Sequence, residues 1–326
     1  MTVPKWIHTL LLEIISTFRN AASISIHLFK VMVPVIIFVK ILQVFNLIDY
    51  LAIPLKPIMY TVGLPAEMGL VWATAIIDTP YSAIIVFMSI FDQMPINTAQ
   101  LTILATMIMI AHNLPVELKV VQKAGLRLPF QAVLRLGSAL LVGATLNIFY
   151  SFFDVLQNEP TILLAWNALE SDQSLSQWAV SKTLMLLNIF LIIFLLMLLM
   201  SLLKKIGVVN IIKRILTPLM RVIGTSDKAA TVTVIGLCLG INYGSGLILS
   251  ETKAGELSKQ DIFGSLSLMG INHAIIEDTI LMKMLGADLS GILFLKLILT
   301  ILLVATLINA VKRLPYRVKE AYLWYS

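Results

Sequence analysis

The sequence GINHAIIEDTILMKMLG, residues 270–286, decides the fold. It lies in an apolar segment, yet it carries His273, Glu277 and Asp278. Charged side chains at bilayer depth are costly and persist mainly where they face a cavity or a partner. An earlier sequence, HNLPVELKVVQKAG at 112–125, has the same spacing from histidine to glycine. The two sequences therefore predict one helix present in two copies, with a polar site between them.

The composition is that of a polytopic, all-α membrane protein whose main partner is the lipid bilayer. The chain has 326 residues, of which 59% are hydrophobic and 13% charged, and its mean hydropathy is +0.93. A soluble globular protein carries about 25% charged residues. The net charge of +6 is attributed to basic loops beside the membrane and not to nucleic-acid binding.

Several function classes are disfavoured by the motifs. No G-x-x-x-x-G-K-[ST] phosphate loop occurs, which argues against direct drive by ATP or GTP. Neither H-E-x-x-H nor a serine nucleophile motif occurs, so we expect no enzyme and no resident cofactor. The one cysteine, Cys238, excludes a disulfide within the chain.

Apolar segments of about 20 residues predict the crossings. We expect six spanning helices, at Leu28–Ile48, Ile96–Val121, Leu136–Phe153, Leu184–Leu203, Ile262–Leu285 and Ile292–Ala310. Two further apolar segments are interrupted in the middle and predict re-entrant hairpins, at Pro65–Phe91 and Thr231–Ser250.

The predicted organisation follows from these segments. An amphipathic helix on the membrane surface is expected at 1–27, a first repeat at 28–153, an acidic polar linker at 154–182, a second repeat at 183–313 and a basic tail at 314–326.

A shift of the chain by 161 residues superimposes the two repeats without a gap. The informative matches are those of scarce residue types, because the apolar residues of two unrelated membrane helices also match by chance. They are Pro57 with Pro218, Gly63 with Gly224, His112 with His273, and Gly125 with Gly286.

Positive charge predicts the orientation. If each repeat crosses the membrane three times, the second copy is inverted and most of the 24 Lys and Arg residues lie on the cytoplasmic side, Arg135 among them. Four crossings per repeat would remove this bias. We therefore expect both termini in the cytoplasm and the linker outside.

The second repeat supplies the first candidate site residues. His273 and Glu277 are four apart and would share one face of a continuous helix, while Asn272 offers an amide. Glu277 would bind a cation or a substrate donor and His273 a proton. The alternative is a hydrogen-bonded pair that only locks helix packing. The place of Asp278 is left open.

The first repeat supplies a broken helix. Pro115 follows His112 by three residues and frees a backbone carbonyl beside His112 and Asn113. Transporters place substrates and coupling ions at such breaks. Glu117 is five residues after His112 and would not share its face, so a gate or a surface ion pair both stay open for it.

The hairpin tips supply the remaining candidates. The first tip carries Asp78 and Thr79, and the second is glycine-rich and carries Asn242 and Ser245. Glycines let a backbone approach a ligand closely, although they also serve close helix packing. His112, His273 and Glu277 are the candidate metal ligands.

These motifs resemble the nucleoside-recognition, or Gate, domain. That domain is found in spore maturation proteins A and B and in the membrane part of ferrous-iron transporter family B. It is more distantly similar to the core of concentrative nucleoside transporters. The resemblance covers roughly 30–150 and 185–312 and implies two inverted Gate repeats in a bacterial inner (plasma) membrane.

By this resemblance, substrate contacts are expected from the hairpin tips and broken helices. The corresponding residues here are Asp78, Thr79, His112, Asn113, Asn242, Ser245, Asn272, His273 and Glu277. The chain lacks the GTPase domain of the iron transporters and the additional helices of the nucleoside transporters.

The leading hypothesis is a secondary transporter of a small polar solute, nucleoside-like in its chemistry and coupled to H⁺ or Na⁺. The alternative is a divalent metal ion permease. A second alternative is a non-transporting membrane protein in envelope or developmental assembly. Whether the chain forms a homo-oligomer is left open by the sequence.

Overall fold

The computed structural model describes residues 5–45, 47–91, 94, 96–163, 174–253 and 257–325. Within these ranges some side chains are not described, among them those of residues 241–243 and 245. Apart from an isolated β-bridge between Leu126 and Trp324, the regular structure of the described residues is helical. The protein is therefore all-α, as predicted.

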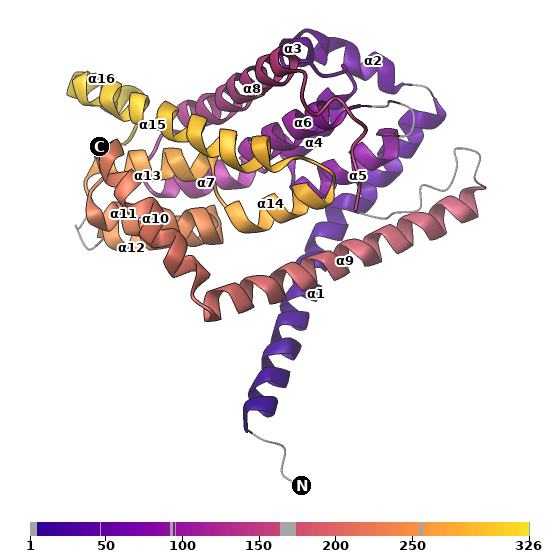
Figure 1. Ribbon diagram of the computed structural model, residues 1–326, viewed down its shortest axis with the longest axis horizontal. Helices are drawn as coiled ribbons and strands as arrows, with labels where there is room; N and C mark the ends of the chain where they lie inside the picture. The colour runs from indigo at the N-terminus through magenta and orange to yellow at the C-terminus, as the bar shows by residue number, and fades with distance from the viewer. Residues whose placement is uncertain are drawn as a thin grey trace. The chain divides into compact units, whose positions relative to one another are not determined.

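One compact unit comprises Met1–Leu47 and Ala165–Val208. Its helices α1 (Lys5–Val44) and α9 (Leu175–Lys205) pack against each other (Figure 1). The ring of Phe18 meets Phe190 and Phe194 edge-on, with ring centroids 5.4 and 5.6 Å apart. Helix α1 continues without interruption from Lys5 to Val44, so the described part of the amphipathic segment expected at 1–27 lies in the same helix as most of the predicted first span.

The second unit comprises Ile48–Leu164 and Val209–Ser326. Its first half contains α2 (Ile48–Ala52), the 3₁₀ turn η1 (Ile53–Leu55), α3 (Lys56–Thr61), α4 (Met68–Ile77), α5 (Pro80–Ile90), α6 (Thr98–Ile110), α7 (Leu114–Lys123) and α8 (Leu128–Phe153). The remainder is α10 (Val208–Ile223), α11 (Asp227–Leu239), α12 (Ile241–Lys253), α13 (Lys259–Ile271), α14 (Ile275–Met284), the π-helical η3 (Ser290–Leu295), α15 (Lys296–Arg313) and α16 (Tyr316–Tyr322).

Helix boundaries in this unit recur at a spacing of 161 residues. The bounds of α6 and α7 fall on those of α13 and α14. The backbone between the helices recurs as well, because Asn113 and Ala274 both adopt the left-handed conformation, at φ 49° and 48°. The glycine pairs used to find the register, at 63 and 224 and at 125 and 286, all have positive φ.

Among the described residues, five helices are long and apolar enough to cross a membrane. They are Leu11–Val44, Thr98–Lys123 with α6 and α7 taken together, Leu128–Phe152, Leu175–Lys205 and Ser290–Arg313. The expected sixth span, Ile262–Leu285, is not among them; its helices α13 and α14 carry charged residues. The protein is thus a multi-pass membrane protein.

The centre of the second unit is built around α6. The most apolar stretch of 18 residues within Thr98–Lys123 is 78% buried. The corresponding stretches of the other four candidate spans are only 22–33% buried. Indole N–H of Trp72 on α4 donates to the carbonyl of Met107 on α6 at 3.3 Å. Figure 1 shows α13 between α15 and α11, its neighbours in the contacts of the unit.

The C-terminal segment is folded onto the turn between α7 and α8. Leu323 and Trp324 are buried, and the backbone N–H of Tyr325 donates to the carbonyl of Gly125 at 2.9 Å. The guanidinium of Arg127 donates to the carbonyl of Glu320 at 2.8 Å. The predicted tail at 314–326 is therefore part of the packed unit.

The left-handed backbone at Ala274 gives the first prediction. A residue with a Cβ costs roughly 1–2 kcal/mol in this conformation, and glycine does not. We expect Ala274→Gly to raise the thermal unfolding temperature of the detergent-purified protein. Ala132→Gly, within α8, should lower it. An equal loss of stability in both variants would contradict the left-handed geometry.

Candidate functional site

Two interrupted helices carry the candidate site. Helix α6 ends at Ile110 and α7 begins at Leu114, while α13 ends at Ile271 and α14 begins at Ile275. Proline at position 115, in the first turn of α7, cannot donate the hydrogen bond that would continue α6. In the second copy, where residue 276 is isoleucine, the left-handed Ala274 accompanies the break.

The breaks bring the two predicted histidines together. His112 and His273 are 6% and 3% exposed, and their Nε2 atoms are 3.1 Å apart. The Oε1 atom of Glu117 lies 3.5 Å from Nε2 of His112 and 3.2 Å from Nε2 of His273. Two imidazoles and a carboxylate thus converge in a buried cluster.

Arg135 of α8 supports this cluster from the other side. It forms an ion pair with Oε2 of Glu117. Its Nε donates to the carbonyl of Ile110 at 2.9 Å and its Nη2 to the carbonyl of His112 at 3.0 Å. Because the break leaves these carbonyls without helical partners, the arginine satisfies the broken backbone and neutralises the carboxylate together.

A second acid–base pair stands at the equivalent positions 161 residues later. Asp278 corresponds to Glu117, and Lys296 corresponds to Arg135. Both are buried, at 8% and 1% exposure. The lysine ammonium lies 3.9 Å from Sδ of Met109. Ionisable side chains buried in membrane helices are functional candidates by default.

The tip of the α4–α5 hairpin is bound to the first break. The backbone N–H of Asn113 donates to the carbonyls of Ala75 and Asp78, each at 2.8 Å. The hydroxyl of Ser82 donates to the Asp78 carboxylate. These bonds place the predicted Asp78 beside the residue that follows His112.

The same hairpin reaches the second break through Tyr81 of α5. Its hydroxyl donates to Oε1 of Glu277 on α14 at 3.5 Å. Glu277 therefore belongs to the surroundings of the site, although the carboxylate that lies close to the two imidazoles is that of Glu117. Two of the predicted metal ligands, His112 and His273, belong to the described group that could hold an ion, and the role of Glu277 as a ligand stays a prediction.

Several buried polar atoms near the breaks have no hydrogen-bond partner in the described structure. The amide of Asn272 has neither its Nδ2 nor its Oδ1 paired, and Asn272 is 1% exposed. The hydroxyls of Thr79 and Thr279 and Oδ2 of Asp278 are also unpartnered. In an apolar environment such groups are normally satisfied by protein, water or a ligand.

The structure brings together most of the predicted site residues. Six of the predicted residues either take part in the contacts described above or are next in the chain to a residue that does. They are Asp78, Thr79, His112, Asn113, His273 and Glu277. Asn272 directly precedes His273. The backbone of Asn242 and Ser245 lies in the first turns of α12, and their side chains lie outside the described residues.

Two residues of the cluster are not among the site residues that the sequence predicts. The sequence places Arg135 among the basic residues of the cytoplasmic side, and the structure buries its side chain, which is 2% exposed. The sequence leaves Glu117 open between a gate and a surface ion pair, and its 4% exposure argues against the surface pair. The pairing of Glu117 with Asp278 and of Arg135 with Lys296 in the 161-residue register would have singled out both.

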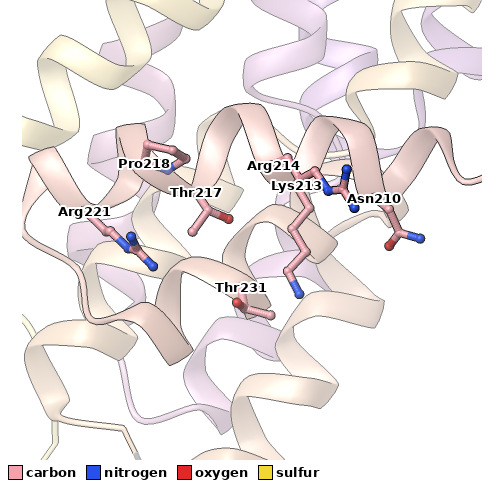
Figure 2. A pocket seen from close by; sticks show the side chains of 7 residues that line it. All are labelled: Asn210, Lys213, Arg214, Thr217, Pro218, Arg221 and Thr231. Atoms are coloured by element: carbon pink, nitrogen blue, oxygen red, sulfur yellow. The ribbon is translucent and has the colours of Figure 1, made fainter.

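A separate basic pocket lies along α10. It encloses about 530 Å³ and is lined by Lys213, Arg214 and Arg221 with neighbouring polar residues of α10. Figure 2 shows these side chains with Thr231 of α11 opposite them. Arg221 is paired with Asp227, its Nη2 donating to Oδ2 at 3.1 Å.

The fold is that of a multi-pass membrane protein, and part of its second half is similar to a known domain. Residues 186–288 match the Gate family model, described as nucleoside recognition. The matched region contains α13, α14 and His273. The first copy, with His112 and Glu117, lies outside it.

The chain is a distant homologue of an uncharacterized membrane protein, YvoD, of Bacillus subtilis (strain 168). The two are 24% identical over 285 residues, which cover 87% of this chain and 90% of the relative. No solved structure matches the chain. The comparisons establish the Gate domain and a bacterial membrane homologue.

The buried ion pair generates the second prediction. Arg135→Met leaves the Glu117 carboxylate buried without its partner, which typically costs about 3–5 kcal/mol. We expect a large drop in the thermal unfolding temperature. Glu117→Gln added to Arg135→Met should restore part of that stability, because it removes the unpaired charge.

The matched control for this prediction is the exposed pair Arg221–Asp227. Its side chains are 56% and 70% exposed, and exposed pairs contribute only about 0–1 kcal/mol. Asp227→Asn should leave the unfolding temperature nearly unchanged. If Arg135→Met were as mild as Asp227→Asn, the buried pairing would be refuted.

Proposed function

We propose that the protein is a secondary transporter that moves a small polar solute through a core of two inverted Gate repeats. The observation that carries the proposal is the set of unpartnered polar atoms beside the two helix breaks, among them both polar atoms of the Asn272 amide. Buried polar groups at membrane depth cost free energy unless something pairs with them. A polar solute crossing at this point would supply that pairing.

The chemistry of the unpaired groups favours a solute with neighbouring donors and acceptors. An asparagine amide offers both a donor and an acceptor side by side. Together with the hydroxyls of Thr79 and Thr279 it would recognise an amide-like edge, such as that of a nucleobase. This supports a nucleoside-like solute and agrees with the description of the matched Gate family.

The lengths of the hairpin helices support the re-entrant arrangement. α4 and α5 have 10 and 11 residues, about 15–17 Å at 1.5 Å per residue. The hydrocarbon core of a bilayer is about 30 Å thick. Helices that reach only halfway would enter and leave on one side, which gives three crossings per repeat and inverts the second copy.

Inversion makes a topological prediction, the third. The protein has one cysteine, so Cys238→Ala gives a cysteine-free background. We expect Lys123→Cys and Arg214→Cys, both at exposed positions, to be protected in intact cells from a membrane-impermeant thiol reagent. Glu159→Cys, in the linker, should be labelled.

Permeabilised cells supply the control, in which all three introduced cysteines should react. Four crossings per repeat would move the positions of Lys123 and Arg214 to the outside. Labelling of those two cysteines in intact cells would therefore disprove three crossings per repeat with a cytoplasmic N-terminus.

Transport itself is the fourth prediction. Proteoliposomes containing the full chain should take up a labelled nucleoside in a manner abolished by ionophores that dissipate H⁺ or Na⁺ gradients. Asn272→Ala should reduce uptake roughly tenfold or more, since losing a hydrogen bond to a buried polar group costs about 1–3 kcal/mol. Asn188→Ala, at an exposed position of α9, should leave uptake unchanged.

Uptake of no solute from a panel of nucleosides and related polar compounds would overturn the nucleoside proposal. If uptake were unchanged in Asn272→Ala, the proposed solute-binding site at Asn272 would be disproved. The second candidate function is a divalent metal permease, which the two imidazoles and the carboxylate of Glu117 favour. Uptake of metal without uptake of solute would select it.

A further inference from the structure

The tautomers of the two histidines determine what their cluster can bind. Nδ1 of His112 lies 3.0 Å from the carbonyl of Ile108, and Nδ1 of His273 lies 2.9 Å from the carbonyl of Met269. A carbonyl oxygen only accepts hydrogen bonds, so each Nδ1 carries the proton. In the neutral imidazole the Nε2 atom then presents a lone pair.

Both lone pairs point into the same small space as a carboxylate oxygen. The Nε2 atoms are 3.1 Å apart, and Oε1 of Glu117 lies 3.5 and 3.2 Å from them. The other oxygen of this carboxylate is engaged by Arg135. Three acceptors that face one another repel unless a cation lies between them.

We propose that His112, Glu117 and His273 form a binding site for one divalent transition-metal ion of the Zn²⁺ type. Metal–nitrogen bonds of about 2.0–2.1 Å in a tetrahedral site hold neighbouring ligand atoms about 3.3–3.4 Å apart. The observed separations of 3.1–3.5 Å bracket that spacing. Imidazole suits Zn²⁺, Fe²⁺ and related ions, whereas Mg²⁺ and Ca²⁺ prefer oxygen ligands.

The outer contacts also fit a metal site. Metal-bound histidines usually donate their other ring N–H to a carbonyl or carboxylate, and metal-bound carboxylates are hydrogen-bonded in turn. Both imidazoles here donate to backbone carbonyls one turn earlier, and Glu117 accepts from Arg135. All three ligands are therefore oriented by atoms that would not touch the ion.

The ligand set leaves room for an exchangeable fourth ligand. Two histidines and one glutamate make three protein ligands in the described structure, the number found in zinc sites that keep an open position.

The ligands come from both halves of the chain, because His112 and Glu117 belong to the first copy and His273 to the second. Binding can be measured on purified protein whether or not a solute is transported. Loss of solute uptake and loss of metal binding are thus separate results.

The fifth prediction tests the site with Co²⁺ and Zn²⁺ on the full chain, purified in detergent with a histidine-free tag and stripped of metal. We expect one Co²⁺ per chain, with the intense visible absorption of four-coordinate cobalt, displaced by Zn²⁺ but not by Mg²⁺. Zn²⁺ should also raise the unfolding temperature by mass action.

The variants identify the ligands. His112→Ala, His273→Ala and Glu117→Gln should each weaken Co²⁺ binding by more than about a hundredfold, since loss of an outer-shell partner alone costs about 10–100-fold. His27→Ala, at an exposed position of α1, should bind like the unaltered protein. His273→Gln, of similar size, serves if an alanine variant does not elute as a folded species in size-exclusion chromatography.

Stoichiometric binding lost in the ligand variants and kept in His27→Ala would establish the site. Absence of Co²⁺ binding by the unaltered protein would overturn the proposal, as would binding that survives in the His112→Ala/His273→Ala double variant. Metal binding without solute uptake would overturn the proposed solute transport and leave the metal site standing.

Discussion

The contact on which the site depends is the one between Arg135 and the broken end of α6. A break in a helix at membrane depth exposes carbonyls that water cannot reach, and each unsatisfied group is costly. The guanidinium binds two such carbonyls and the Glu117 carboxylate at once. Without this side chain, the two carbonyls at the break and Oε2 of the buried acid would each lack this partner.

The two halves carry different acidic and basic residues at the equivalent positions beside their helix breaks. In the second copy the acid is one methylene shorter and the base is a lysine, whose compact ammonium lacks the planar fork of arginine. Asp278 retains an unpartnered oxygen, whereas Glu117 reaches both imidazoles. Arg135 and Glu117 thus form an ion pair, whereas one carboxylate oxygen of Asp278 has no hydrogen-bond partner. The two halves differ in the acid and the base, since the histidines and helix bounds match.

The sequence predicted the helical class and the meeting of the histidines, because scarce residues in a gap-free register report directly on duplicated structure. It left open the role of Glu117, the carboxylate that lies close to both imidazoles. Periodicity of 3.6 pairs His273 with Glu277 and separates His112 from Glu117, but that rule holds only in a continuous helix. The left-handed residues at 113 and 274 redirect the chain between each histidine and the following acid. The long helix α1 and the packed C-terminal segment likewise depend on tertiary contacts that local composition does not encode.

Neither half of the chain makes the site alone, and this links architecture to activity. The imidazoles approach within 3.1 Å only because α6–α7 and α13–α14 break at the same level. A movement of one broken helix relative to the other would separate the ligands of a cation and also change the surroundings of Asn272. A ligand that binds more tightly in one arrangement of the two halves would therefore shift the population of the protein toward that arrangement. A polar site shared between two copies of one unit can in this way couple occupancy to conformation.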